Sequence, residues 1–76
     1  MSDRQDQVLE VIAKIARQEK TAIKPEHELA ADLGIDSPKG LQLLMELEEK
    51  LKIEISDEDA ARMNTVGDIM KFVNAH

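Results

Sequence analysis

Cysteine, tryptophan and tyrosine are absent from the sequence, and Phe72 is the only aromatic residue among 76. The absence of cysteine excludes disulfide bonds and thiolate metal sites, and it fits a reducing compartment. With almost no aromatic residues, a core must be built from Leu, Ile, Val, Ala and Met. A chain of this length forms one small domain that buries only about 60% of its unfolded surface. We therefore expect a single domain over residues 1–76.

Long apolar runs and an excess of basic residues are also absent. No stretch approaches the roughly 20 apolar residues that cross a bilayer, and the N-terminal MSDRQDQ is too polar for a signal peptide. Sixteen acids against ten bases give a net charge of −6, which disfavours binding to the phosphates of nucleic acid. These absences predict a cytoplasmic monomer with no membrane span and no nucleic-acid partner.

Acidic residues are concentrated in the middle of the chain. Residues 32–59 hold nine acids and three bases, whereas residues 1–31 hold six acids and five bases. An acidic surface in this region would attract a basic partner. A solvated helix face explains the same pattern, and charge alone leaves both interpretations open.

Apolar spacing predicts four helices, the third of them short, and one long loop. The first helix is expected over residues 3–19, after a capping box of Ser2 and Gln5. Residues 20–36 lack the helical pattern and contain Pro25 as a breaker, so they predict a loop after the first helix. Loops of this length in compact domains are often functional.

Ser37 is the expected N-cap of the second helix, with Pro38 in the first turn. Ser56 and Thr65 are the expected caps of the short third helix and of the last helix. The inward positions of the second helix are Gly40, Leu43, Leu44, Leu47 and Leu51, and those of the last are Val66, Ile69, Met70 and Val73.

The stretch GIDSPKG places the hydroxyl of Ser37 at the end of the loop, with no visible catalytic partner. A serine nucleophile needs a positioned base and an oxyanion hole, but the only histidines are His27 and His76. No catalytic triad is recognisable, which predicts that the chain is not an enzyme. The segment DEDAARMNTVGD lacks the alternating ligands and central glycine of a calcium loop, so no metal site is predicted.

A serine at a helix start can instead be acted upon by another enzyme. The exposed amides and the helix dipole favour a negative group at this position, so Ser37 suits a phosphate-linked modification. A plain N-cap explains the same residue. Local chemistry leaves both interpretations open.

From its first helix to FVNAH the chain resembles the acyl carrier protein family, most clearly in DLGIDS, LLMELEEKLKIEISDEDA and NTVGDI. DLGIDS is similar to the family's attachment motif, Asp-Ser followed by a helix with apolar residues at fixed offsets. The resemblance implies an all-α four-helix bundle. It also implies that a phosphopantetheinyl transferase attaches 4′-phosphopantetheine from coenzyme A to Ser37. The arm would carry an acyl cargo as a thioester, and the cargo can slip between the helices.

In the family, the helix after the serine is the main surface that partner enzymes contact. The resemblance therefore implies that acyl-loading and acyl-processing enzymes dock here through basic patches. The matched positions are Asp36, Glu48, Glu49 and Asp57 for charge, and Leu41, Met45 and Ile55 for apolar contact.

Three residues near Ser37 depart from the pattern of fatty-acid carriers. Pro38 stands where these carriers typically have Leu, and Lys39 and Gln42 stand where they usually have acids. The resulting change of about three charge units is large enough to alter which basic partners dock. It indicates a carrier for a particular acyl, polyketide or aminoacyl pathway. A helical protein-interaction module without a prosthetic group is the alternative from another class.

Overall fold

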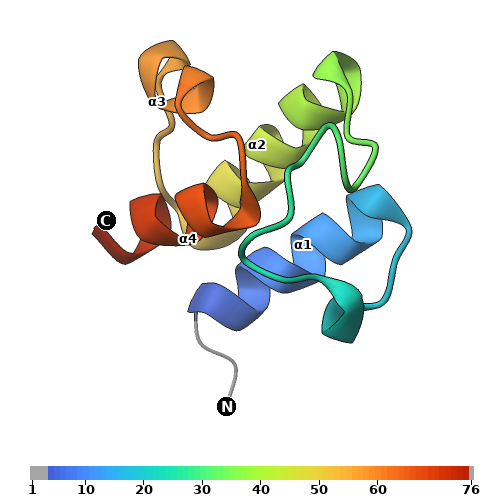
Figure 1. Cartoon of the computed structure of the whole chain (residues 1–76). Helices are drawn as coiled ribbons and strands as arrows, with labels where there is room; N and C mark the ends of the chain where they lie inside the picture. The colour runs from blue at the N-terminus through green and yellow to red at the C-terminus, as the bar shows by residue number, and fades with distance from the viewer. Residues whose placement is uncertain (1–3, 76) are drawn as a thin grey trace.

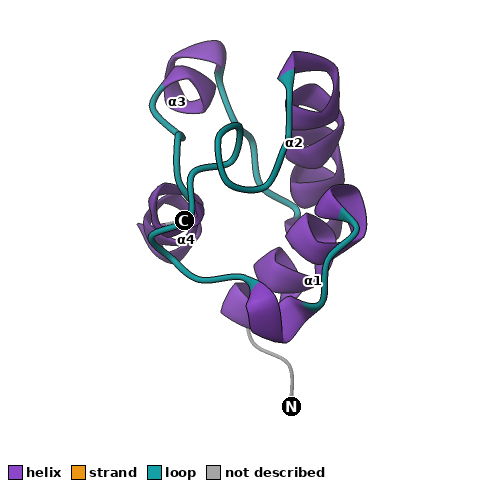
Figure 2. Ribbon diagram, turned by 45° about the vertical axis from the view of Figure 1, so that its right-hand side comes forward, coloured by secondary structure: helices purple, strands orange, loops and turns teal. Residues whose placement is uncertain are grey.

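The computed structural model describes residues 4–75 and shows an all-α arrangement of four helices and one 3₁₀ turn in that range. The elements are α1 (Arg4–Ala16), η1 (Lys20–Ala22), α2 (Ser37–Leu51), α3 (Asp57–Ala61) and α4 (Val66–Ala75). α1 packs against both α2 and α4, and the chain after η1 passes between the α3–α4 side and the α1–α2 side (Figures 1 and 2). The predicted four-helix fold with a short third helix is confirmed.

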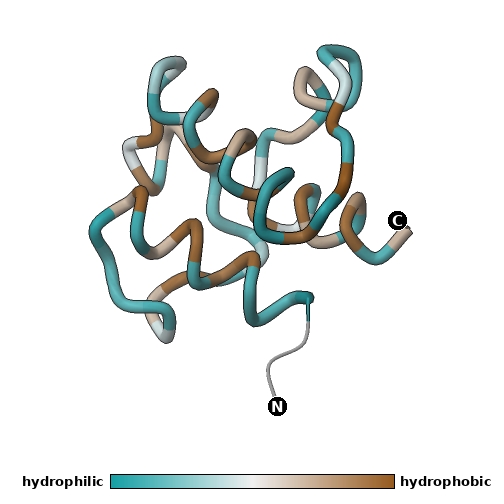
Figure 3. Tube along the Cα trace, turned by 180° about the vertical axis from the view of Figure 1, so that it is seen from behind, coloured by the Kyte–Doolittle hydropathy of each residue, from teal (hydrophilic) through white to brown (hydrophobic). Residues whose placement is uncertain are grey.

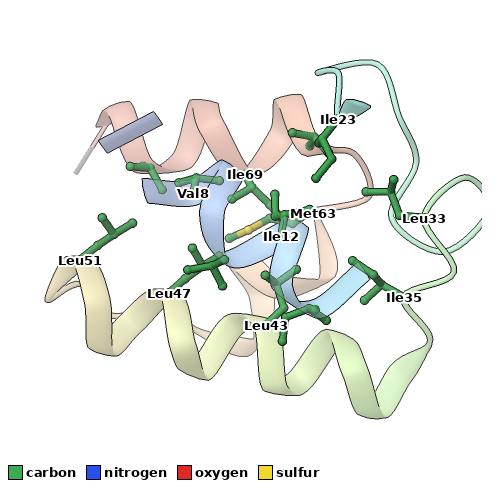
Figure 4. Close-up of a cluster of buried hydrophobic side chains, with 14 residues drawn as sticks. Val8, Ile12, Ile23, Leu33, Ile35, Leu43, Leu47, Leu51, Met63 and Ile69 are labelled. Carbon is green, nitrogen blue, oxygen red and sulfur yellow. The ribbon is translucent and has the colours of Figure 1, made fainter. Parts of the chain in front are cut away.

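An aliphatic core fills the space between the helices. Its innermost members point toward one another from α1, α2 and α4 in Figure 4, and none is more than 1% exposed: Val8, Ile12, Leu43, Leu47 and Ile69. Seen as a tube, each long helix alternates between hydrophobic and hydrophilic positions along its length (Figure 3). This is the pattern expected of amphipathic helices that share one core.

α1 ends three residues before the boundary that its apolar spacing predicts. Arg17 adopts a left-handed conformation with φ +58°, and the Gln18 amide donates to the Ala13 carbonyl at 3.1 Å. A left-handed residue with such a closing bond is a common helix ending. Ser2 of the predicted capping box lies outside the described residues.

Backbone hydrogen bonds anchor the long loop to the start of α4. The Val66 amide donates to the His27 carbonyl at 3.1 Å. The next amide, that of Gly67, donates to the Pro25 carbonyl at 2.8 Å, and a Cβ at Gly67 would lie 3.1 Å from the same oxygen. This close approach favours glycine, because the loop and α4 would have to separate to admit a side chain.

A reciprocal cap begins α4. The Asp68 amide donates to Thr65 Oγ1, and Asp68 Oδ2 accepts from the amides of Asn64 and Thr65, each at 3.1 Å. These backbone hydrogen bonds lower the pKa of Asp68 below its ordinary value of 3.8. The ionised carboxylate therefore contributes stability above that value, and the contribution is lost as the pH falls through the lowered pKa.

We therefore expect Asp68→Asn to reduce the acid sensitivity of the fold. The amide does not titrate, so the variant should lose less free energy of unfolding than the parent between neutral pH and pH values below 3.8. Urea unfolding at a series of pH values measures the difference. Equal losses in the two proteins would show that the Asp68 cap makes no contribution to acid unfolding.

Candidate functional site

The end of the loop presents Ser37 at the first position of α2. Ile35 is buried and its amide donates to the Leu29 carbonyl at 2.8 Å, which fixes the chain just before the helix. Gly34 turns the backbone here with φ +67°, a conformation that glycine adopts without strain. The loop therefore delivers Ser37 to the surface from a rigid, partly buried segment.

Asp36, and not Ser37, is the N-cap of α2, so the predicted capping role of Ser37 is wrong. Asp36 Oδ1 accepts from the Lys39 amide at 3.2 Å, and the Asp36 carbonyl accepts the first helical bond from Gly40 at 2.7 Å. Ser37 is therefore the first helical residue, and Pro38 is the second, one position later in the helix than the predicted N1. The cap is supplied by a carboxylate, so the serine hydroxyl is not needed to begin the helix.

The Ser37 side chain is exposed, and no hydrogen bond to its hydroxyl occurs within residues 4–75. It stands among the first amides of a 15-residue helix, where the helix dipole favours negative charge. A phosphodiester on this oxygen would therefore be stabilised by the amides of the first turn. An exposed and unbonded hydroxyl is also accessible to an enzyme that modifies it.

A largely apolar pocket of about 440 Å³ opens beside the serine, between the loop, α2 and α3. Its lining residues are Leu29, Ala30, Ile35, Asp36, Ser37, Gly40, Leu43, Leu44, Ala60, Met63 and Asn64. Apart from Asp36, the residues of this set from the loop, from α3 and from the turn after it were not predicted as site residues, since only the fold brings them to α2. The pocket gives an apolar group tethered at Ser37 a place out of water.

The predicted docking residues of α2 divide into exposed side chains and partly buried ones. Leu41 and Met45 are 64% and 62% exposed, so these two apolar side chains do not belong to the edge of the core. Lys39 and Gln42 are also exposed, and Glu49 is exposed beside the groove between α1 and α2. Two large exposed apolar side chains one turn apart are typical of a contact surface.

Glu48 and Ile55, two further predicted docking residues, are partly buried and contact each other. Glu48 Oε2 accepts from the Ile55 amide at 2.9 Å. This bond holds the α2–α3 connection against α2, so Glu48 has a structural role that its sequence position does not indicate. Asp57 is exposed at the first position of α3.

The other flank of α2 is linked to α1 by an ion pair. Lys14 Nζ lies 2.8 Å from Glu46 Oε1, and Gln42 Nε2 donates to Glu46 Oε2 at 3.4 Å. The Lys14 contact lowers the pKa of Glu46 below its ordinary value.

No His, Cys, Asp or Glu side chains in the described part of the chain form a group of three suited to a metal ion.

The sequence matches the family defined by a phosphopantetheine attachment site over residues 6–73. The chain therefore belongs to the acyl carrier protein family, whose members act as carriers and not as catalysts. Its cofactor is covalent 4′-phosphopantetheine, and the family interacts with phosphopantetheinyl transferases and acyl-processing enzymes.

Two solved structures support this assignment. A candidate acyl carrier protein from Mycobacterium tuberculosis, Rv0033, is similar with a TM-score of 0.89 and 36% identity, over 96% of this chain and 97% of that chain. The acyl carrier protein of Enterococcus faecalis has a TM-score of 0.73 and 31% identity, over 93% of this chain and 95% of that chain. No helix within residues 4–75 is long and apolar enough to cross a membrane.

Proposed function

We propose that Ser37 carries the phosphopantetheine arm and that the chain presents acyl thioesters to the enzymes of a specialised pathway. The observation that carries the proposal is the exposed, unbonded Ser37 hydroxyl at the start of α2, beside an apolar pocket. A cytoplasmic location and a monomeric state remain predictions from the sequence.

The residues around Ser37 fit the chemistry of attachment. Transfer would form a bond between Ser37 Oγ and the phosphorus that bears the pantetheine and break the pyrophosphate bond of coenzyme A, so that adenosine 3′,5′-bisphosphate leaves and the serine hydroxyl loses its proton. Asp36 keeps the first turn of α2 formed through its bond to the Lys39 amide, so the helix amides remain directed toward the new phosphodiester. When attached, the group supplies a terminal thiol that holds the cargo as a thioester.

The pocket beside Ser37 is the proposed binding site for the apolar part of the cargo. Leu43 and Leu44 form one wall, and Ala60 and Met63 form another. Burial of each CH₂ group stabilises the bound state by about 0.8 kcal/mol. A cargo with a few carbons inside the pocket would therefore be held there, shielded from water. The fully buried part of the core is aliphatic apart from Met63, with Phe72 packed against it from outside, and its Met and aliphatic residues can repack around a chain.

Intact-mass measurement tests attachment. The chain is incubated with coenzyme A and a phosphopantetheinyl transferase, and we expect a single addition of one phosphopantetheine, located on the peptide that contains Ser37. Addition at another residue would move the site. No addition with any of several transferases would favour the protein-interaction module without a prosthetic group.

The exposed Lys39 and Gln42 support a specialised partner. A basic docking patch built for acids would meet a like charge at Lys39 and no counter-charge at Gln42. We therefore expect the loaded carrier to be a poor substrate for a general fatty-acid elongation enzyme. Exposed charges are worth about 0.2–1 kcal/mol each, so the two changes together correspond to a loss of about twofold to thirtyfold in kcat/KM.

The double variant Lys39→Asp/Gln42→Glu should raise kcat/KM with the general elongation enzyme, and more at low salt than at moderate salt. The matched control is Lys71→Asp/Asn74→Glu, which makes the same charge change at the same spacing on exposed positions of α4. If the parent carrier already serves the general enzyme as well as the double variant does, the specialised-pathway proposal is wrong and the fatty-acid system replaces it.

A further inference from the structure

The end of α1 and the first turns of α2 form a basic corner on an otherwise acidic protein. It consists of Lys14, Arg17 and Lys39, which line one surface depression of about 210 Å³ together with Ile15 and Gln42. The whole chain has a net charge of −6. The basic corner is therefore a local reversal of the charge of the molecule.

Within residues 4–75, two of the three cations in the basic corner have no carboxylate partner. Lys14 is paired with Glu46 at 2.8 Å, although its side chain is still 70% exposed. Arg17 and Lys39 are exposed, and no ion pair involves either of them within residues 4–75. Their charges are solvated and accessible to a molecule that docks on this face.

The basic corner lies where a partner enzyme must approach. Lys39 is two residues from Ser37 in the first turns of the same helix, and an enzyme that acts on a group tethered to Ser37 has to reach this end of α2. A typical partner covers about 800 Å² of surface. The footprint of such an enzyme would therefore include Lys39, and Arg17 adjoins Lys39 in the same depression.

We propose that the basic corner binds carboxylate side chains of a partner protein. The partner's contact face would then have two signs, with basic residues opposite the exposed acids Glu49 and Asp57 and acidic residues opposite Arg17 and Lys39. This inference rests on the proposed carrier function and adds the chemistry of the partner. Complementary charges at two separated places fix orientation and exclude partners whose contact face is wholly basic.

The charges around the basic corner favour protein carboxylates, and not an extended polyanion, as its ligand. Nine acids lie between Asp32 and Asp59, and several of them lie on or next to α2, the helix that carries Lys39. A long polyanion such as nucleic acid would be repelled by these residues beyond the basic corner. Two or three carboxylates on a folded surface match the size of the corner and reach fewer of these acids than a long polyanion would, although Glu46 pairs with Lys14 at its edge.

Nuclear magnetic resonance titration of the labelled chain with an acetylated triglutamate amide at low salt tests the proposal. We expect shifts centred on the amides of Arg17 and Lys39, in both the unmodified and the phosphopantetheine-loaded chain. Arg17→Glu/Lys39→Glu should abolish them. The matched control Lys24→Glu/Lys71→Glu makes the same charge change at other exposed positions and should retain them.

A second variant removes the two positive charges without adding negative ones, so that weaker binding of the peptide cannot be attributed to repulsion between acids. Arg17 has φ +58°, which Asn tolerates well, so Arg17→Asn/Lys39→Gln should fold and bind the peptide about twofold to thirtyfold more weakly. Equal binding by this variant would overturn the proposal. So would equal shifts with inorganic phosphate, which indicate a general anion site, or shifts on concentrating the chain alone, which indicate self-association.

Failure here is distinguishable from failure of the carrier function. The peptide titration on the unmodified chain does not depend on the arm. A chain that accepts phosphopantetheine and ignores the peptide remains a carrier without an acidic partner surface opposite its basic corner.

Discussion

The Ser37→Ala variant should remain at its unmodified mass in the presence of coenzyme A and a phosphopantetheinyl transferase. Complete loss is expected because the substitution removes the only oxygen to which the proposed phosphodiester can form. The fold should be almost unaffected, with a change in the free energy of unfolding within about 0.5 kcal/mol, because Asp36 caps the helix. Intact mass and urea unfolding measure the two effects on one sample.

Asp36→Ala is the companion variant for this experiment. It removes the side chain that accepts from the Lys39 amide and should reduce the free energy of unfolding by about 0.5–2 kcal/mol, while Ser37 keeps its hydroxyl. A Ser37→Ala protein that still gains the arm would place attachment elsewhere. A Ser37→Ala protein as unstable as Asp36→Ala would restore a capping role to the serine.

Leu47→Ala should destabilise the fold by about 2–5 kcal/mol. Leu47 is fully buried and points into the core between α1 and α4 (Figure 4), so its truncation leaves a cavity that a small domain cannot easily close. A domain of this size has a total stability of about 4–11 kcal/mol. The variant should therefore unfold at a much lower urea concentration.

Leu41→Ala is the matched control for the core substitution, because it makes the same chemical change in the same helix at a residue that is 64% exposed. Its effect on stability should stay within about 0.5 kcal/mol. Similar losses for the two variants would contradict the division between the core face and the contact face of α2.

Helical periodicity was sufficient to predict the three longer helices, because their apolar positions repeat on one face, whereas the short α3 was predicted from its Ser56 cap and the acids that follow it. The cap of α2 was predicted wrongly for a physical reason. Asp36 and Ser37 are adjacent, and either side chain can accept a hydrogen bond from an amide three residues later. The choice depends on the buried position of Ile35, which fixes where the loop ends and the helix begins.

Ser37 was predicted as the attachment site from the resemblance of DLGIDS to the family motif, but its surroundings were not predicted. The pocket is completed by Leu29 and Met63 from the segments before and after α2. Likewise, Arg17 meets Lys39 only because α1 packs against α2. Periodicity within one helix carries no information about such neighbours, since they depend on how the helices pack.

The five-residue α3 has a consequence for the range of cargo that the protein can hold. No residue of α3 is buried, so displacing it exposes little apolar surface and requires less free energy than opening any long helix. Its backbone amides should exchange hydrogen with solvent sooner than those of α2. Because α3 borders the pocket through Ala60, the site has one compliant wall and one rigid wall. If the pocket holds the cargo as proposed, we expect cargo of increasing length to be admitted by progressive displacement of α3, while α1, α2 and α4 keep their packing.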